Sequence, residues 1–121
     1  MSNDFLLVGS FLDSTWTEVL ISALSPIGQL DTVLESNFSE QIHRKRYSLI
    51  IVDASGSRDI IGLVAALRQE LPHIPIVIVT ASPTWQRARQ VFLAGATDYV
   101  RKSLNTEKIL KTFQTILATA R

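Results

Sequence analysis

The chain has 121 residues, of which 46% are hydrophobic and 19% are charged, so its composition is that of one globular domain and not of a disordered tail. Twelve Lys and Arg residues against eleven Asp and Glu residues give a net charge of +1, which argues against a domain that binds nucleic acid through charge alone. Cysteine is absent, which excludes disulfides, thiolate zinc sites and a cysteine nucleophile.

Five segments of the chain have the residue pattern of β-strands. Three of them are continuous apolar runs rich in β-branched residues, which is typical of strands buried on both faces of a parallel sheet. In chain order, the predicted strands are Phe5–Val8, Gln29–Leu34, Leu49–Val52, Ile76–Val79 and Thr97–Arg101, of which the second and the fifth are weaker.

Helical periodicity fills the segments between these strands. In the first segment, Thr15 and Glu18 have the spacing of an N-terminal capping box. The apolar stripe that follows includes Trp16, which we expect to face the core. A weaker helix is predicted over Phe38–Arg46, and a stronger third helix is expected to end before Pro72.

The last two helices have recognisable starts. Ser82 followed by Pro83 predicts the start of the fourth helix, because Ser is a good N-cap and Pro is favoured in the first turn. Asn105 is the predicted N-cap of the fifth helix. Strand and helix therefore alternate five times, which predicts one α/β domain over residues 1–121, with a mostly parallel sheet and helices on both faces.

Three polar residues come at the carboxyl ends of three predicted strands, where the functional crevice of such sheets lies. They are Asp53, Thr80 and Lys102. A carboxylate can act as a nucleophile toward a phosphoryl group, while an ammonium and a hydroxyl can hold the oxygens of that group. Asp53 alone could simply cap a loop or a helix, but its register with the other two residues favours a common site.

Asp53 after an apolar strand, Thr80–Ala81 after Pro75–Val79, and the segment Ala94–Lys102 together resemble the receiver domain of bacterial two-component response regulators. The resemblance extends over nearly the whole chain. It implies a flavodoxin-like (CheY-like) fold, which is a doubly wound sheet of five parallel strands in the order 2-1-3-4-5 with five helices.

The resemblance also assigns a role to each of four residues. Asp53 is implied to accept a phosphoryl group, Thr80 to bond a phosphoryl oxygen and Lys102 to pair with the phosphoryl group. Tyr99 is implied to be the switch residue, whose ring moves inward when the switch is thrown. The phosphoryl donor is implied to be a histidine kinase or a phosphotransfer protein.

The chain departs from the family after the first strand. Receivers carry two adjacent acids there, which hold Mg²⁺ together with the phosphoacceptor, whereas this chain has Gly9 and Ser10. Asp53 and the backbone carbonyl of Ser55 remain as possible Mg²⁺ ligands, so we expect the metal site to be weak or absent. Asp13 is expected to cap the first helix.

Two further departures concern the loops. Ser103 follows Lys102, whereas the family has a proline in a cis peptide at this position. Because a cis bond before another residue costs about 2.5–4 kcal/mol, we expect the lysine to be aimed differently. The loop after Asp53 lacks the family's usual proline, and Gly62 comes one place later than expected.

The resulting functional prediction is a signal-transduction receiver that is switched by phosphorylation of Asp53 and is not an enzyme. The alternative is a pseudo-receiver that acts as a protein-interaction or dimerisation module without phosphorylation. A flavin enzyme is disfavoured, because the loop Gly9–Asp13 lacks the run of donors that a phosphate group needs. No apolar stretch reaches the roughly 18 residues of a membrane span, and no secretory signal is present, so the predicted location is cytoplasmic.

The expected partners, besides the kinase, are a downstream effector domain and a second copy of the chain. The homodimer would use the fourth helix, the fifth strand and the fifth helix, and an exposed Trp85 would mark a contact surface. No direct nucleic-acid binding by this domain is expected, since the basic run over residues 43–46 suits a solvated helix end. The alternative for this face is a merely solvated surface. Its charged residues are Arg87, Arg89, Asp98, Arg101, Glu107, Lys108 and Lys111.

Overall fold

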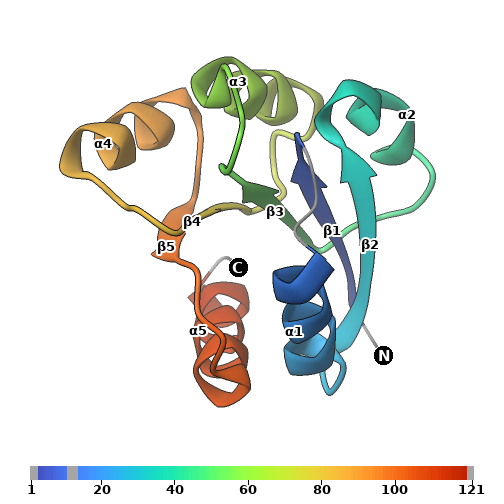
Figure 1. Cartoon of the computed structure of the whole chain (residues 1–121). Coiled ribbons are helices and arrows are strands. Elements are labelled where there is room, and N and C mark those ends of the chain that lie inside the picture. Colours follow the sequence, from blue (N-terminus) through green and yellow to red (C-terminus); the bar gives the residue numbers. More distant parts are fainter. Residues whose placement is uncertain (1–2, 11–13, 120–121) are drawn as a thin grey trace.

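Five parallel strands form one sheet between two layers of helices in the computed structural model, which describes residues 3–10 and 14–119 (Figure 1). The strands are β1 (Asn3–Gly9), β2 (Gly28–Leu34), β3 (Leu49–Asp53), β4 (Ile76–Thr80) and β5 (Asp98–Arg101). The helices are α1 (Ser14–Leu24), the 3₁₀ turn η1 (Glu35–Asn37), α2 (Phe38–Gln41), α3 (Ile60–Glu70), α4 (Trp85–Ala94) and α5 (Thr106–Thr119).

The strand order is β2-β1-β3-β4-β5, and every neighbouring pair is parallel, which confirms the predicted fold. The register places Gly9 opposite Asp53, and Asp53 opposite Val79. Thr80 in turn lies opposite Arg101. The carboxyl ends of four strands therefore meet at one edge of the sheet.

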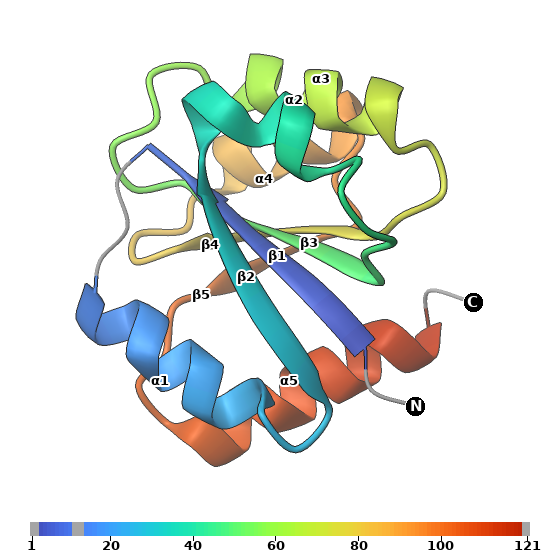
Figure 2. The ribbon, with the colours of Figure 1, turned by 90° about the vertical axis from the view of Figure 1, so that its right-hand side faces the viewer.

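Helices cover both faces of the sheet, with α1 and α5 on one face and α2, α3 and α4 on the other (Figure 2). Each face has its own buried cluster, because side chains alternate along a strand. Leu49 and Ile51 of β3 pack toward α1 and α5, while Ile50 and Val52 pack toward α3. Strands buried on both sides in this way need continuous apolar runs, which explains why their sequences do not alternate.

The structure corrects three of the predicted helix boundaries. Helix α1 begins at Ser14, so Thr15 lies inside the helix and is not its N-cap, while Asp13 lies outside the described residues. Helix α2 ends at Gln41 and does not continue to Arg46. The chain leaves the helix because Tyr47 must turn inward to reach the core.

The third correction concerns the start of α4, where the N-cap is Thr84 and not Ser82. The hydroxyl of Thr84 accepts a hydrogen bond from Arg87 N at 3.2 Å, and its backbone N donates to Tyr99 Oη at 3.3 Å. The N-cap predicted for α5 is confirmed, because Asn105 Oδ1 accepts from Lys108 N at 3.0 Å.

Arg68 of α3 fixes the far end of α4. Its guanidinium donates twice to the carbonyl of Gly95, at 3.0 and 2.8 Å, and also to the carbonyls of Leu71, at 2.9 Å, and Ile74, at 2.7 Å. Gly95 has a φ of 125°, and a Cβ there would lie 2.7 Å from the Arg68 side chain, so glycine is required for two reasons. The end of α3, the start of β4 and the end of α4 are thus held together.

A second polar network joins β2 to the segment before β3. Tyr47 donates to Asp31 at 2.8 Å, and Lys45 forms an ion pair with the same carboxylate at 2.9 Å. Burial would raise the pKa of Asp31, but the hydrogen bonds from Lys45 and Tyr47 and the charge of Lys45 outweigh it and lower the pKa. This network is a stabilising feature and contributes no residue to the edge where Asp53 lies.

Candidate functional site

Asp53 is the last residue of β3, and its side chain is 1% exposed. No other charged side chain among the described residues is as fully buried. A buried carboxylate is costly unless its oxygens are paired. Here Oδ1 accepts a hydrogen bond from Ser55 N at 2.9 Å, and Oδ2 forms an ion pair with Lys102 Nζ at 2.9 Å.

Lys102 reaches Asp53 from the end of β5. Its backbone N donates to the Thr80 carbonyl at 2.9 Å, which extends the pairing of β4 and β5 by one residue. Its side chain is 11% exposed, and Nζ also donates to Ser55 Oγ at 3.1 Å. The backbone of β5 therefore directs the ammonium toward the carboxyl edge of β3.

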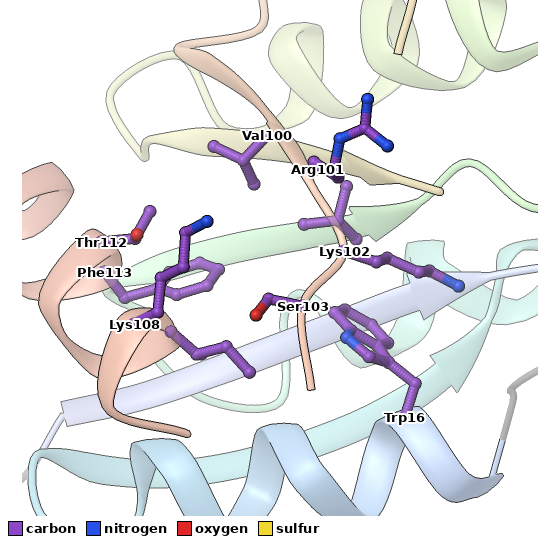
Figure 3. A pocket seen from close by; sticks show the side chains of 10 residues that line it. Trp16, Val100, Arg101, Lys102, Ser103, Lys108, Thr112 and Phe113 are labelled. Atoms are coloured by element: carbon purple, nitrogen blue, oxygen red, sulfur yellow. The ribbon is translucent and has the colours of Figure 1, made fainter. Parts of the chain in front are cut away.

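Trp16 of α1 lies under the lysine. The ammonium of Lys102 is 4.8 Å from the centre of the indole ring, within the range of a cation–π contact. Figure 3 shows the Lys102 side chain extending above Trp16. Trp16 is 3% exposed, which confirms that it faces the core, whereas its contact with the lysine could not be predicted from the residue pattern.

The peptide between Lys102 and Ser103 is trans, as are all the peptide bonds in the described part of the chain. The lysine nevertheless reaches Asp53 at 2.9 Å. The expectation that it would be aimed differently without a following proline is therefore wrong, because Lys102 contacts Asp53 with a trans peptide after it.

Thr80 and Tyr99 lie beside this pair but do not bond to it. Thr80 is one residue past the β4 partner of Asp53, and its hydroxyl accepts from Ser82 N at 3.2 Å. The Tyr99 hydroxyl accepts from the backbone N of Thr84. Within the described hydrogen bonds, neither hydroxyl contacts Asp53. The structure thus brings Asp53 and Lys102 together and places Thr80 and Tyr99 against the loop that leads into α4.

The described residues around Asp53 do not fit a Mg²⁺ site. Mg²⁺ prefers several oxygen ligands, carboxylates among them, in near-octahedral geometry. The described residues contain no group of three His, Cys, Asp or Glu side chains that could hold a metal ion. Gly9 lies opposite Asp53 without a side chain, and Ser10 Oγ donates to the Ser55 carbonyl at 2.9 Å. One carboxylate and a carbonyl that already accepts a hydrogen bond are a poor ligand set for Mg²⁺.

A pocket of about 280 Å³ opens next to Lys102, between the end of β5 and helices α1 and α5 (Figure 3). Its inner wall is apolar and includes Trp16, Val100 and Phe113, while Lys108 and Ser103 lie among its polar lining. The pocket shares Trp16 and Lys102 with the surroundings of Asp53.

Helix α4 is the least buried of the long helices. Val91 is its single buried residue, whereas Trp85 is 88% exposed and Leu93 is 78% exposed. In the described part of the chain, no helix has the length and apolar character that crossing a bilayer requires.

Comparison with known families gives one clear match. The family described as response regulator receiver domain matches residues 29–114. The matched range begins after β1, so it leaves out Gly9 and Ser10, where the chain departs from the family pattern.

Two curated relatives are transcriptional regulatory proteins. PhoP of Escherichia coli strain K12 is 32% identical over 59 residues, which cover 49% of this chain and 26% of PhoP. ZraR of Salmonella typhimurium is 30% identical over 82 residues, which cover 67% of this chain and 19% of ZraR. The matched segments therefore span about a quarter or less of these relatives.

Solved structures of response regulators share the fold. NtrX of Brucella abortus superposes with a TM-score of 0.84 at 21% identity, over 99% of this chain and 28% of NtrX. HP1043, described as an orphan response regulator of Helicobacter pylori, gives 0.82 at 17% identity, over 96% and 97% of the two chains. A response regulator from Thermotoga maritima gives 0.82 at 19% identity, over 98% and 99%.

Proposed function

Because the chain belongs to the response regulator receiver domain family, we propose that it is a signalling switch that is thrown when Asp53 accepts a phosphoryl group. The observation that carries this proposal is the ion pair between Asp53 and Lys102, 2.9 Å long and almost fully buried at the carboxyl edge of the sheet. The pair provides a nucleophilic carboxylate with a cation already beside it.

The proposed chemistry is transfer of a phosphoryl group from a phosphohistidine to Asp53. A carboxylate oxygen of Asp53 attacks phosphorus, the new P–O bond forms as the P–N bond breaks, and the imidazole leaves and takes up a proton. Lys102 Nζ would move toward the negative charge of the phosphoryl group and donate a hydrogen bond to one of its oxygens. The ammonium can do so without a large movement, because it already donates to Asp53 and Ser55.

The proposed switch passes from Asp53 to α4. A phosphoryl group adds charge and strong acceptor oxygens, for which the Thr80 hydroxyl would leave Ser82 N. Tyr99 would then turn toward the space beside Thr80 and release the backbone N of Thr84. Since Thr84 is the N-cap of α4, the first turn of this exposed helix would carry the signal to the surface.

The proposal includes the partners and setting that the sequence predicted. The phosphoryl donor is a histidine kinase or a phosphotransfer protein, and the output is an effector domain or a second copy of the chain that binds through α4, β5 and α5. The two curated relatives are transcriptional regulatory proteins, which supports an effector that acts on transcription. Residues 1–121 would act as one non-enzymatic receiver domain in the cytoplasm.

The proposal is tested by incubating the purified chain with acetyl phosphate or with a phosphorylated histidine kinase, followed by mass spectrometry. We expect one hydroxylamine-labile phosphoryl group on Asp53, lost in Asp53→Asn. Asp59→Asn is the matched control, because Asp59 is an exposed carboxylate that caps α3 in the next loop. Failure to label Asp53 with any donor would overturn the proposal in favour of a module that works without phosphorylation.

A further inference from the structure

A hydrogen bond between Ser10 and Ser55 joins the two loops that flank Asp53. Ser10 Oγ donates to the Ser55 carbonyl at 2.9 Å, across 45 positions of sequence. Ser10 follows Gly9, the β1 residue that lies opposite Asp53, and Ser55 lies two residues after Asp53. This side chain therefore ties the end of β1 to the end of β3 at the proposed phosphorylation site.

All three polar groups of Ser55 are engaged around Asp53. Its backbone N donates to Asp53 Oδ1 at 2.9 Å, its hydroxyl accepts from Lys102 Nζ at 3.1 Å, and its carbonyl accepts from Ser10. The loop after β3 is thus fixed by side chains from two other segments. In the family that this chain belongs to, Mg²⁺ is typically held at the phosphorylation site, where it can serve as such a link.

The charges at the site also balance without a divalent cation. The described residues supply one carboxylate, from Asp53, and one ammonium, from Lys102, in direct contact. Two additional acids at positions 9 and 10 would add two negative charges and create a demand for a cation. Gly9 and Ser10 add none, so the described residues leave no excess negative charge at the resting site.

We propose that the Ser10 hydroxyl takes the place of the divalent cation as the link between the loops, so that Asp53 accepts its phosphoryl group without a divalent cation. Ser10 is a positioning residue in this proposal, because it acts on Asp53 through Ser55. The proposal rests on the proposed function and adds the metal independence of the same site.

The first test measures the rate of Asp53 labelling by acetyl phosphate in excess EDTA and in millimolar MgCl₂. We expect the same rate in both. Labelling only in MgCl₂ would overturn the metal independence and leave the proposed function standing. Labelling in neither would overturn the proposed function, and the role of Ser10 would then be decided by the melting temperature.

The melting temperature of the wild-type chain is expected to be the same in EDTA and in MgCl₂, and a rise in MgCl₂ would overturn the inference. Ser10→Ala should lower it by about 4 °C, the effect of losing one hydrogen bond in a domain of this size. Ser48→Ala is the matched control, because Ser48 Oγ makes a comparable bond of 3.2 Å to Asn3 at the other end of β1.

Both alanine variants should lose stability, but only Ser10→Ala should slow the labelling of Asp53, and Ser10→Thr, which keeps the hydroxyl, should restore the rate. If Ser10→Ala is labelled as fast as Ser48→Ala, Ser10 has no positioning role and the inference fails.

Discussion

Lys102 belongs to the most deeply buried ion pair among the described residues. It neutralises the buried carboxylate of Asp53 and is itself 11% exposed. Taking such a pair out of water costs free energy that the attraction between its members only partly returns. The pair is therefore better explained by the cation that it places beside the carboxylate of Asp53 than by a net gain in the free energy of unfolding.

Removing the lysine tests this interpretation. Lys102→Met should lower the free energy of unfolding by about 3–5 kcal/mol, because the variant leaves the buried carboxylate without a cation. Asp53→Asn in the same background should recover part of the loss, since the amide carries no charge. Urea denaturation at neutral pH measures both effects, with Lys111→Met on the exposed face of α5 as the control. A double variant no more stable than Lys102→Met would contradict this account.

At the scale of elements, the network of Asp31, Lys45 and Tyr47 links β2 to the segment before β3. The stability that this network contributes should depend on pH in the acid range. The folded chain holds the pKa of Asp31 below its ordinary value, so the folded state binds this proton less readily than the unfolded state does. The stabilisation is fully present above the unfolded pKa of about 3.9 and is lost as the pH falls through the lower folded value.

Asp31→Asn should therefore reduce stability most at neutral pH, and its difference from the wild type should shrink between about pH 4 and the lowest pH at which the chain stays folded. Urea unfolding midpoints measured over this range check the prediction. Ser22→Ala, an exposed substitution on α1 that removes no ionisable group, should differ from the wild type by a constant amount. A constant difference for Asp31→Asn as well would show that this carboxylate is not linked to folding.

The elements that could be predicted from the sequence are those whose pattern is set by burial. Continuous apolar runs identify β1, β3 and β4, because both faces of these strands are covered. The start of α4 could not be predicted from burial, since Ser82 and Thr84 are both good N-caps. The contact of Thr84 with Tyr99 favours Thr84. The end of α2 likewise depends on the core position that Tyr47 must reach.

The site could be predicted in part for the same reason. Parallel strands bring their carboxyl ends together, so the convergence of Asp53 and Lys102 follows from topology. The contacts of Ser10 with Ser55 and of Trp16 with Lys102 depend on loop paths and on the angle of α1, which carry no local signal in the sequence.

For the molecule as a whole, α4 carries more exposed large apolar side chains than any other element that the structure describes. Trp85, Phe92 and Leu93 are all exposed there, and the helix has two arginines but no acid. Acidic residues occur nearby, at Asp98 in β5 and at Glu107 in α5. Mixed charges around an apolar centre suit a symmetric contact between two copies of the chain.

We therefore expect the chain to self-associate with increasing concentration, and to do so more strongly when Asp53 is phosphorylated. Leu93→Glu should weaken the association at least tenfold, because it buries a charge in the contact. Ile21→Glu is the matched control, since Ile21 is an exposed apolar residue on α1. Sedimentation velocity measures the effect, and equal weakening by both variants would exclude a specific contact through α4.

The placement of the two tryptophans gives the chain two separate optical reporters. Trp16 is buried with an ammonium 4.8 Å above its ring, so its fluorescence should be emitted at short wavelength and should change when Lys102 moves. Trp85 is 88% exposed, so its emission should lie at long wavelength and be open to quenching by iodide. Emission recorded at the two wavelengths over time thus separates events at Asp53 from events on α4, and the order of the two changes shows which comes first.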